Sequence, residues 1–396
     1  MGLPISSEIQ HAVTVSNKER ERKRAAGAKR KKNDSKKPVS VPAIVDSTIS
    51  SPPPVNTWID DVIKKWDNGP ISSIKSLHSV GLTILKKLAS LPETPASVPG
   101  NNVVDILGDP TRGHISPNLR LVINDLLVSR DHNVVDFLTR NSEYGISGHD
   151  ILVSVLNPLI GLDMDSSERR LYGALDIRLG NLGIALCQYK ATPYVYDKSC
   201  MVHETQWTVT LTPPGAITHT HMDYYGRRQF FVHLFGEKIW LLWPPTKKNL
   251  DIFRKYHTET AQADLTARCI DELEGLEVFH VKKEQAFVLK PNVLHACMSI
   301  HLSSHLGGWL WRMADQKSSL SMVDWGLDWL SEKMSKDAPI SDYKEDLNVI
   351  KSEIDAWKQL VKKNKDDKEA KEVRKRLQDL EQKFSFVKGL FNYTLS

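Results

Sequence analysis

The residues of this sequence best suited to chemistry are His221, Asp223 and His295. His221 and Asp223 are two apart, so on a strand their side chains point to one face. His295 follows Asp223 by 72 residues, in another strand-like segment that could return beside the first. Two neutral imidazoles and one carboxylate on one face of an octahedral ion form the ligand set of Fe(II) centres that activate oxygen. We therefore predict that these three residues bind Fe(II) and form the catalytic centre.

The apolar and aromatic run 230–243 contains one lysine, Lys238. A lysine inside such a run is costly to bury unless an anion accompanies it. The second carboxylate of 2-oxoglutarate, at the opposite end from its metal-chelating keto acid, would be a suitable anion. The hydroxyl of Thr218, three residues before His221, could bond the same carboxylate. The alternative for Lys238 is an exposed position in a hairpin next to the glycine at 236.

A set of short strands has to position these residues. From about residue 194 the apolar pattern changes to a period of two, and Pro and Gly residues separate the segments. The expected strands are 207–212, 230–243, 278–281, 285–290, 293–295, 299–301 and 310–313. Many short strands divided by turns favour a jelly roll over a parallel sheet. The mouth of such a barrel can hold a small ligand.

Helical patterns lie on both sides of the strand region. Residues 57–145 are expected to be mainly helical, and residues 316–396 are expected to end in a helical hairpin with a break at 363–367. The apolar positions of the hairpin are Leu347, Ile350, Ile354, Trp357, Val361, Ala370, Val373, Leu377, Leu380, Phe384 and Val387. This apolar face could pack on its own domain, or it could pair with a second copy to form a homodimer.

Composition excludes some classes of protein. Hydrophobic residues make up 40% of the 396 residues, and ten are Trp, which is enough for a core. No run of 18 apolar residues occurs, so we expect no membrane span. The four cysteines are scattered without a Cys-x-x-Cys pair, which favours a reducing compartment over a disulfide framework or zinc finger.

The positive charge is concentrated near the beginning of the sequence. Residues 18–37 hold eleven Lys and Arg against three acidic residues, whereas the whole chain has a net charge of +5, so the remainder is mildly acidic. Residues 1–56 are expected to be a disordered basic tail. The basic block predicts nuclear import or a weak, non-specific contact with nucleic acid. The alternative is a solvated tail without a specific role.

The central segment resembles the JmjC oxygenases, in particular the F-box-linked and PHD-finger-linked histone lysine demethylases. The matching residues are Thr218, His221, Asp223, Gly236, Lys238, Pro244-Pro245-Thr246, Asn249-Leu250, Pro291, His295-Ala296 and Gly307-Gly308. The resemblance implies an α+β protein with a double-stranded β-helix over 146–315 and flanking helices. It also implies that His221, Asp223 and His295 bind iron and that Thr218 and Lys238 bind 2-oxoglutarate. The implied substrate is a protein, such as a histone tail.

Three departures from the family pattern fall where substrate is expected. Tyr225 replaces a small residue, Phe231 replaces an aromatic hydroxyl, and Trp309 replaces an asparagine. Three functions therefore stay open: lysine demethylation, hydroxylation of a protein or small molecule, and a non-catalytic JmjC interaction module. His219, two residues before His221, is expected on the same face, as an outer residue because a fourth protein ligand would block the open side of the metal.

Overall fold

A computed structural model describes most of the unit Asn56–Ser396. It describes residues 58–394, with gaps at 94, 101, 108–118, 129–132, 140, 161–169, 179–196, 198, 203–207, 224–225, 258–263, 284, 335–343 and 365–367. The predicted basic tail and Tyr225 lie outside the described residues.

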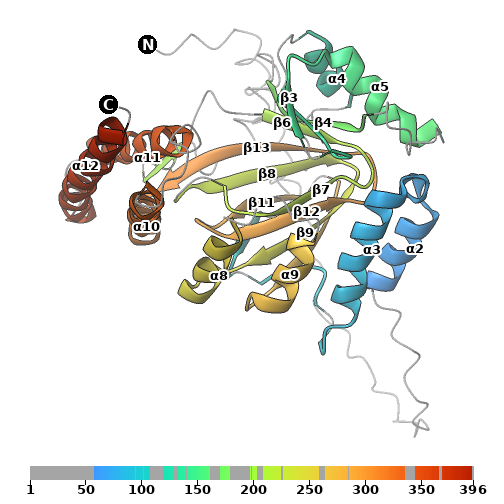
Figure 1. Cartoon of the computed structure of the whole chain (residues 1–396), viewed down its shortest axis with the longest axis horizontal. Helices are drawn as coiled ribbons and strands as arrows, with labels where there is room; N and C mark the ends of the chain where they lie inside the picture. The colour runs from blue at the N-terminus through green and yellow to red at the C-terminus, as the bar shows by residue number, and fades with distance from the viewer. Residues whose placement is uncertain are drawn as a thin grey trace, which may run out of the picture. The chain divides into compact units, whose positions relative to one another are not determined.

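Two antiparallel sheets form the centre of the described unit (Figure 1). The larger sheet has the order β1-β11-β8-β13-β6-β4-β2-β3, with β5 paired to β13. Its strands are β1 (Val104–Leu107), β2 (Asn133–Asp136), β3 (Asn141–Tyr144), β4 (Tyr172–Arg178), β5 (Cys200–Val202), β6 (Thr208–Thr212), β8 (Arg228–Phe235), β11 (Ala286–Leu289) and β13 (Ser303–Arg312). The smaller sheet has the order β10-β9-β12-β7, from β7 (Ile217–His221), β9 (Glu237–Trp243), β10 (Glu277–Lys282) and β12 (Leu294–Ser299).

Strands β1 to β6 all lie in the larger sheet, and most of the strands that follow β6 change sheet from one to the next. From β6 to β9, and again from β10 to β13, each strand lies in the other sheet from its predecessor. This connectivity is the one expected of a jelly roll, and the antiparallel sheets with their flanking helices confirm the α+β prediction. Gly236, between β8 and β9, adopts φ +85°, and a Cβ there would lie 2.3 Å from the carbonyl oxygen of Leu302, so this turn requires glycine.

The alternation of side chains along the strands divides the core into layers. An interior cluster lies between the two sheets and comprises Val103, Val104, Phe231, Trp240, Leu242, Phe279, Val281, Phe287, Leu289, Val293 and Cys297. The opposite face of the smaller sheet, with Ile239, Leu241 and Trp243, belongs to a second cluster. The opposite face of the larger sheet, with Phe230, Val232 and Leu234, belongs to a third.

Helices cover the outer faces of both sheets (Figure 1). The cluster outside the smaller sheet includes side chains of α2 (Trp58–Asn68), η1 (Pro70–Ser73), α3 (Lys75–Ala89), α8 (Lys247–His257) and α9 (Leu265–Glu272). The cluster outside the larger sheet includes side chains of α4 (Leu119–Val128) and α5 (Gly148–Leu156), which η2 (Asn157–Ile160) follows. The prediction that 57–145 is mainly helical missed β1, β2 and β3. Each of these strands is only four residues long, and the partners β11 of β1 and β4 of β2 lie far away in sequence.

Glu237, the first residue of β9, ties the helical layer to the sheets. Its carboxylate accepts hydrogen bonds from His280 of β10 and from Lys65 of α2, the latter at 2.8 Å. The His280 hydrogen bond, together with Lys65, lowers the pKa of Glu237 to about 2 in spite of burial. The ion pair therefore holds the N-terminal helices against the strand that carries Lys238.

The C-terminal part contains η3 (Met313–Asp315), α10 (Gln316–Met334), α11 (Lys344–Lys363) and α12 (Lys368–Thr394). The apolar face predicted for a hairpin packs with α10 and with Trp311 of β13 in one buried cluster. Glu353 of α11 accepts hydrogen bonds from Trp311 at 2.8 Å and from the Arg227 guanidinium, so the helices are anchored to the strands. The homodimer stays a prediction. Across the part of the chain that the structure describes, no helix combines the length and the apolar character that a membrane crossing requires.

Candidate metal centre

A β-bulge in β7 determines which of its side chains face the interior. His221 pairs with His295 of β12, and Thr218 pairs with Cys297. His219 and Thr220 thus both lie opposite Ala296, so one extra residue is inserted in β7. Because of this insertion, Thr218 and His221 both lie on the interior face, although simple alternation would place them on opposite faces.

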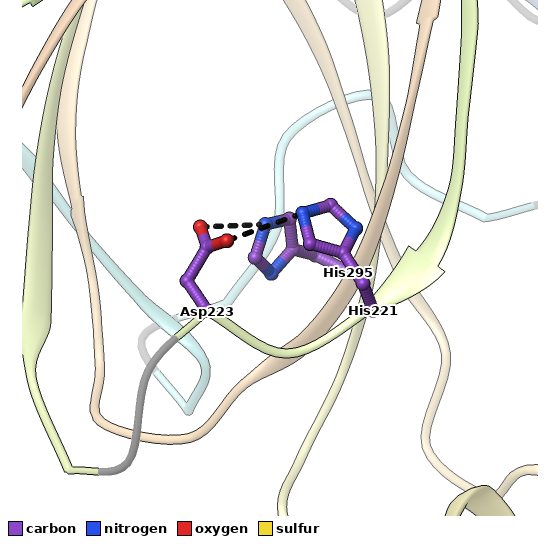
Figure 2. A group of neighbouring side chains, drawn as sticks. All are labelled: His221, Asp223 and His295. Atoms are coloured by element: carbon purple, nitrogen blue, oxygen red, sulfur yellow. Dashed lines mark ion pairs between the residues drawn. The ribbon is translucent and has the colours of Figure 1, made fainter. Parts of the chain in front are cut away.

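The side chains of His221, Asp223 and His295 converge on one point (Figure 2). One ligand atom from each lies within 4.8 Å of the other two. Nε2 of His221 is 3.3 Å from Oδ1 of Asp223, and Nε2 of His295 is 3.4 Å from Oδ2. Adjacent ligands of an octahedral ion, each about 2.1 Å from its centre, lie about 3 Å apart. The spacing of these atoms therefore suits a single ion.

The outer nitrogens of both imidazoles are held by the backbone. Nδ1 of His221 lies 2.8 Å from the carbonyl oxygen of His219, and Nδ1 of His295 lies 3.0 Å from that of Val293. A carbonyl can only accept, so Nδ1 carries the proton in both rings, and a neutral ring then presents the lone pair of Nε2. Both lone pairs face Asp223, as metal binding requires.

The electrostatics of the three residues follow from their proximity. Burial disfavours the charged form of Asp223, but His221 and His295 outweigh it and hold the pKa of Asp223 well below its usual range. Burial likewise opposes a charge on His221, and the Asp223 carboxylate outweighs it and raises the pKa of His221. Asp223 is thus a carboxylate whose negative charge is stabilised by an imidazole on each of two sides. A divalent cation bound between the three side chains would also stabilise that charge.

Gln229 of β8 holds the remaining side of Asp223. Its Nε2 donates a hydrogen bond to Oδ2 of Asp223, and its side chain is 7% exposed. The Oε1 atom of Gln229 is buried and has no hydrogen-bond partner among the described residues. A partner of this kind fixes the direction in which a ligating carboxylate points.

Thr266, on α9, holds the bulge from outside the sheet. Its hydroxyl accepts the backbone N–H of Thr220 at 3.2 Å and lies 3.0 Å from Nδ1 of His219. The extra residue of a bulge leaves a strand amide without its ladder partner, and Thr266 replaces that partner. The expectation that the side chain of His219 shares the face of His221 is therefore wrong, because the bulge turns His219 outward toward α9.

Asn292 links the chain segments that carry the metal ligands. It adopts φ 66° in the turn before His295, and its Oδ1 accepts the backbone N–H of Gly226 at 2.7 Å. Gly226 follows Asp223 by three residues and adopts φ +87°, and a Cβ there would lie 2.7 Å from the carbonyl oxygen of Ser319. The turn and the Asp223 segment are therefore held at a fixed separation.

Lys238 lies deep between the sheets and does not occupy an exposed position in a hairpin. Its side chain is 1% exposed, and burial lowers the pKa of its ammonium group. Nζ donates to Nδ1 of His305 on β13 at 3.0 Å, and no carboxylate of the described residues forms an ion pair with it. In register, Thr218 lies level with Trp240, and Lys238 lies one interior position further from the metal ligands.

The predicted substrate residues have different surroundings. Phe231 is buried, with ring centroids 4.8 Å from Trp240 and 5.1 Å from Phe287. Trp309 is partly exposed and pairs in register with Gln229, so it is level with the metal ligands. The guanidinium of Arg227 lies 5.5 Å from the centre of the Trp309 ring. Tyr225 lies outside the described residues.

Sequence interpretation missed Gln229, Thr266 and His305. Gln229 is six residues after Asp223 in an otherwise apolar strand, a signal that could have been read as a buried polar group in need of a partner. His305 is ten residues after His295, and its spacing does not distinguish it from a histidine of the core. Thr266 lies in a helix with no chemical motif, so only the structure reveals its contact with β7.

The residues present fit a divalent metal such as Fe(II). The donor set is two imidazole nitrogens and one carboxylate. Hydrogen bonds from the Nδ1 atoms of both histidines fix the orientation of the rings. No fourth ligand group among the described residues blocks the open side of the centre. The side chains of His221 and Asp223 are 36% and 30% exposed, whereas that of His295 is 3% exposed. One side of the centre is therefore open to solvent, and the other leads into the interior.

Comparison with known proteins gives structural matches alone. No protein-family model matches the sequence, and no curated protein matches it. The structure matches that of YcfD, a ribosomal oxygenase from Escherichia coli, in complex with cobalt and succinic acid, at 11% identity and a TM-score of 0.33, over 68% of this chain and 65% of that chain. Two further YcfD structures match at 11% and 10% identity with TM-scores of 0.32 and 0.33, over 57% and 56% of this chain and 54% and 52% of theirs. The chain thus spans from about half to just under two thirds of the YcfD chains.

Proposed function

We propose that this protein is an Fe(II)- and 2-oxoglutarate-dependent oxygenase of the JmjC type. The observation that carries the proposal is the convergence of His221, Asp223 and His295 within 4.8 Å, with both Nδ1 atoms held by backbone carbonyls. A second observation supports the co-substrate. The buried ammonium of Lys238 faces the same interior and forms no ion pair with a described carboxylate, although burying such a charge unpaired is costly.

Each residue has a definite task in this proposal. His221, Asp223 and His295 would hold the metal, and Gln229 would keep the Asp223 carboxylate in its ligating orientation. Lys238 and Thr218 would hold the far carboxylate of 2-oxoglutarate inside the barrel. Bound Fe(II), with 2-oxoglutarate and O₂, supplies oxidation of a substrate C–H bond coupled to decarboxylation of 2-oxoglutarate to succinate. The partly exposed side of the centre, near His221 and Asp223, is where substrate would approach.

The substrate that the sequence resemblance favours is a methylated lysine in a protein, such as a histone tail. Oxidation of an N-methyl group gives a hemiaminal, which releases formaldehyde and leaves the lysine demethylated. The basic segment 18–37 agrees with a chromatin-directed, nuclear protein that contacts nucleic acid weakly and without sequence preference.

Hydroxylation of a protein or small-molecule substrate is the second candidate. Phe231 supplies no hydroxyl and is enclosed by Trp240 and Phe287, so it offers no polar contact to a methylammonium group. Trp309 places a large ring level with the metal ligands, where a methylated lysine would need room. A substrate C–H bond on a smaller or flatter group fits these two residues better.

A mass-spectrometric assay separates the two outcomes. The full chain, with Fe(II), 2-oxoglutarate and ascorbate, is incubated with a library of methylated and unmethylated histone peptides and with basic protein extracts. Loss of 14 mass units from a methylated peptide would support demethylation, and gain of 16 mass units would support hydroxylation. Turnover of 2-oxoglutarate that continues in the His221→Ala, Asp223→Ala double variant would overturn the assignment of the catalytic centre. A protein that binds neither metal nor 2-oxoglutarate would be a non-catalytic module.

A further inference from the structure

The interior beyond the metal ligands contains a group of basic side chains. Residues that lie opposite one another on neighbouring strands form a level of the interior. His295 of β12 and His221 of β7 form the first level, at the metal ligands. Cys297, Thr218 and Trp240 form the second level, and Ser299 and Lys238 form the third. Two residues along a strand span about 6.6 Å, so Lys238 lies on the level about 13 Å from that of His295, and its long side chain can reach back.

The larger sheet has matching levels. Gln229 and Trp309 are paired at the level of the metal ligands, Phe231 and Gly307 at the next, and His233 and His305 at the third. The third levels of the two sheets meet, because Nζ of Lys238 lies 3.0 Å from Nδ1 of His305. Lys238, His305 and His233 form the group that we call the basic end of the interior.

His233 is the most unusual member of the basic end. The residue is 1% exposed, and although the Gly236 backbone lies beside the ring, neither Nδ1 nor Nε2 forms a hydrogen bond of good geometry with the described residues. A buried ring with two unpaired polar atoms costs roughly 1–3 kcal/mol for each unmade hydrogen bond. Native proteins rarely retain this cost without a function, a water molecule or a bound ligand.

His305 and Lys238 are also incompletely satisfied. Nδ1 of His305 must be unprotonated to accept from the lysine ammonium, so the ring is neutral and its remaining proton is on Nε2. Burial and Lys238 hold the pKa of His305 well below its usual range. The single hydrogen bond from Nζ leaves the ammonium with further donors, and no carboxylate of the described residues forms an ion pair with it. Lys238, His305 and His233 are thus adjacent groups with unused hydrogen-bond donors, an arrangement that suits an anion.

We infer that His305 and His233 are additional cofactor-binding residues, which receive the far carboxylate of a dicarboxylate together with Lys238. This inference rests on the proposed function and extends it by two residues. A carboxylate has two oxygens and about four acceptor sites, and the three N–H donors of one ammonium diverge too widely to fill them together with one threonine hydroxyl. On binding, the Lys238 ammonium would donate to the carboxylate in place of His305, and the proton of the neutral His305 ring would move from Nε2 to Nδ1, which could then donate beside it. An N–H of His233 would supply a further donor, so the ligand would accept hydrogen bonds from both sheets.

The test compares two ligands that share one end. Oxalate can chelate the metal but lacks a far carboxylate, whereas N-oxalylglycine has both ends of 2-oxoglutarate. Their binding to the Mn(II)-loaded full chain is measured by isothermal titration calorimetry for the wild type and for H305L, H233L, H305Q and H233N. We expect H305L and H233L to bind N-oxalylglycine at least about tenfold more weakly, and to bind oxalate as the wild type does. H305Q can still accept and donate hydrogen bonds and should recover part of the affinity.

The control and the wild type distinguish a failure of the proposed function from a failure of the inference about His305 and His233. The exposed helical residue His149 provides the control H149Q, which should bind both ligands normally. If the wild type binds neither ligand, the proposed function fails. If the wild type binds N-oxalylglycine and both leucine variants bind it equally well, the inference alone is overturned. Equal weakening of oxalate and N-oxalylglycine would also overturn it, because that result indicates a structural role. H233N replaces H233L if the leucine variant does not fold.

Discussion

The hydroxyl of Thr266 should control metal affinity from outside the sheet. Replacing Thr266 with valine keeps the shape of the side chain and removes the one oxygen that accepts the Thr220 amide and contacts His219. Thr266 is fully buried and Thr220 is 3% exposed, so water cannot take the place of that oxygen. The variant therefore loses hydrogen bonds without creating a cavity.

The magnitude follows from these contacts. An unsatisfied buried amide costs about 1–3 kcal/mol, and the lost contact with His219 adds about 1 kcal/mol, so the free energy of unfolding should fall by about 2–4 kcal/mol. The bulge also sets the direction of His221, and loss of an outer hydrogen-bond partner of a metal site typically weakens metal affinity about 10–100-fold. We expect a loss in this range for Thr266→Val.

The assay is a titration of the metal-free protein with Mn(II), followed by electron paramagnetic resonance, together with urea unfolding. Thr266→Ser is the matched control. It keeps the hydroxyl and loses one methyl group, so it should be destabilised by about 1 kcal/mol and should bind Mn(II) as the wild type does. If Thr266→Val is destabilised but its Mn(II) affinity equals that of Thr266→Ser, the bulge does not depend on Thr266 and the reasoning is refuted.

Three further substitutions test neighbouring contacts. Gln229→Leu removes the donor to Asp223 and should weaken Mn(II) binding about 10–100-fold in the same titration, whereas unchanged affinity would contradict an orienting role. Asn292→Ala leaves the Gly226 amide unpaired and should lower the free energy of urea unfolding by about 1–3 kcal/mol, and no loss would show that the link carries no energy. Glu237 has a folded pKa of about 2 against an ordinary 4.5, so its stabilising effect is present above pH 4.5 and is lost as pH falls toward 2. The stability advantage of the wild type over Glu237→Gln, up to about 3 kcal/mol at pH 7, should therefore shrink over that interval in urea unfolding, and a constant difference would contradict it.

The strands of the central region were predictable because their patterns are local. The run 230–243 forms β8 and β9 on either side of Gly236, and the segments around 207–212 and 285–290 contain β6 and β11. The short strands β1 and β2 were not predictable, since four residues carry too little pattern and their pairing partners are distant. The region predicted as helical therefore contributes strands to the larger sheet.

Only part of the arrangement of the site could be predicted from the sequence. The spacing of His221 and Asp223 and the lysine in an apolar run are chemical signals, and the structure places all of these side chains at or between the two sheets. The bulge in β7 is not such a signal, because it depends on pairing with β12 and on Thr266 of a later helix. For the same reason the interior position of Thr218 and the outward position of His219 followed only from the register.

The contacts of Arg227 and Arg228 illustrate a related limit. In sequence they are two adjacent arginines directly before an apolar run, and nothing nearby identifies their partners. In the structure Arg227 pairs with Glu353 of α11, and Arg228 bonds Asp315, with a distance of 2.8 Å between Nη2 and Oδ1. Both arginines thus attach the strands to the C-terminal helices. Their partners lie about 90 to 130 residues further along the chain, so the local sequence does not indicate these contacts.

The central claim is that His221, Asp223 and His295 support 2-oxoglutarate turnover. The most direct measurement is succinate formation from 2-oxoglutarate by the purified full chain with Fe(II) and O₂, with and without added methylated peptides. We expect succinate formation to depend on Fe(II), to be abolished in the His221→Ala, Asp223→Ala double variant, and to be strongly reduced in Lys238→Ala. Succinate formation that survives loss of both metal ligands, or no turnover by a wild type shown to bind Fe(II) and 2-oxoglutarate with any peptide offered, would contradict it.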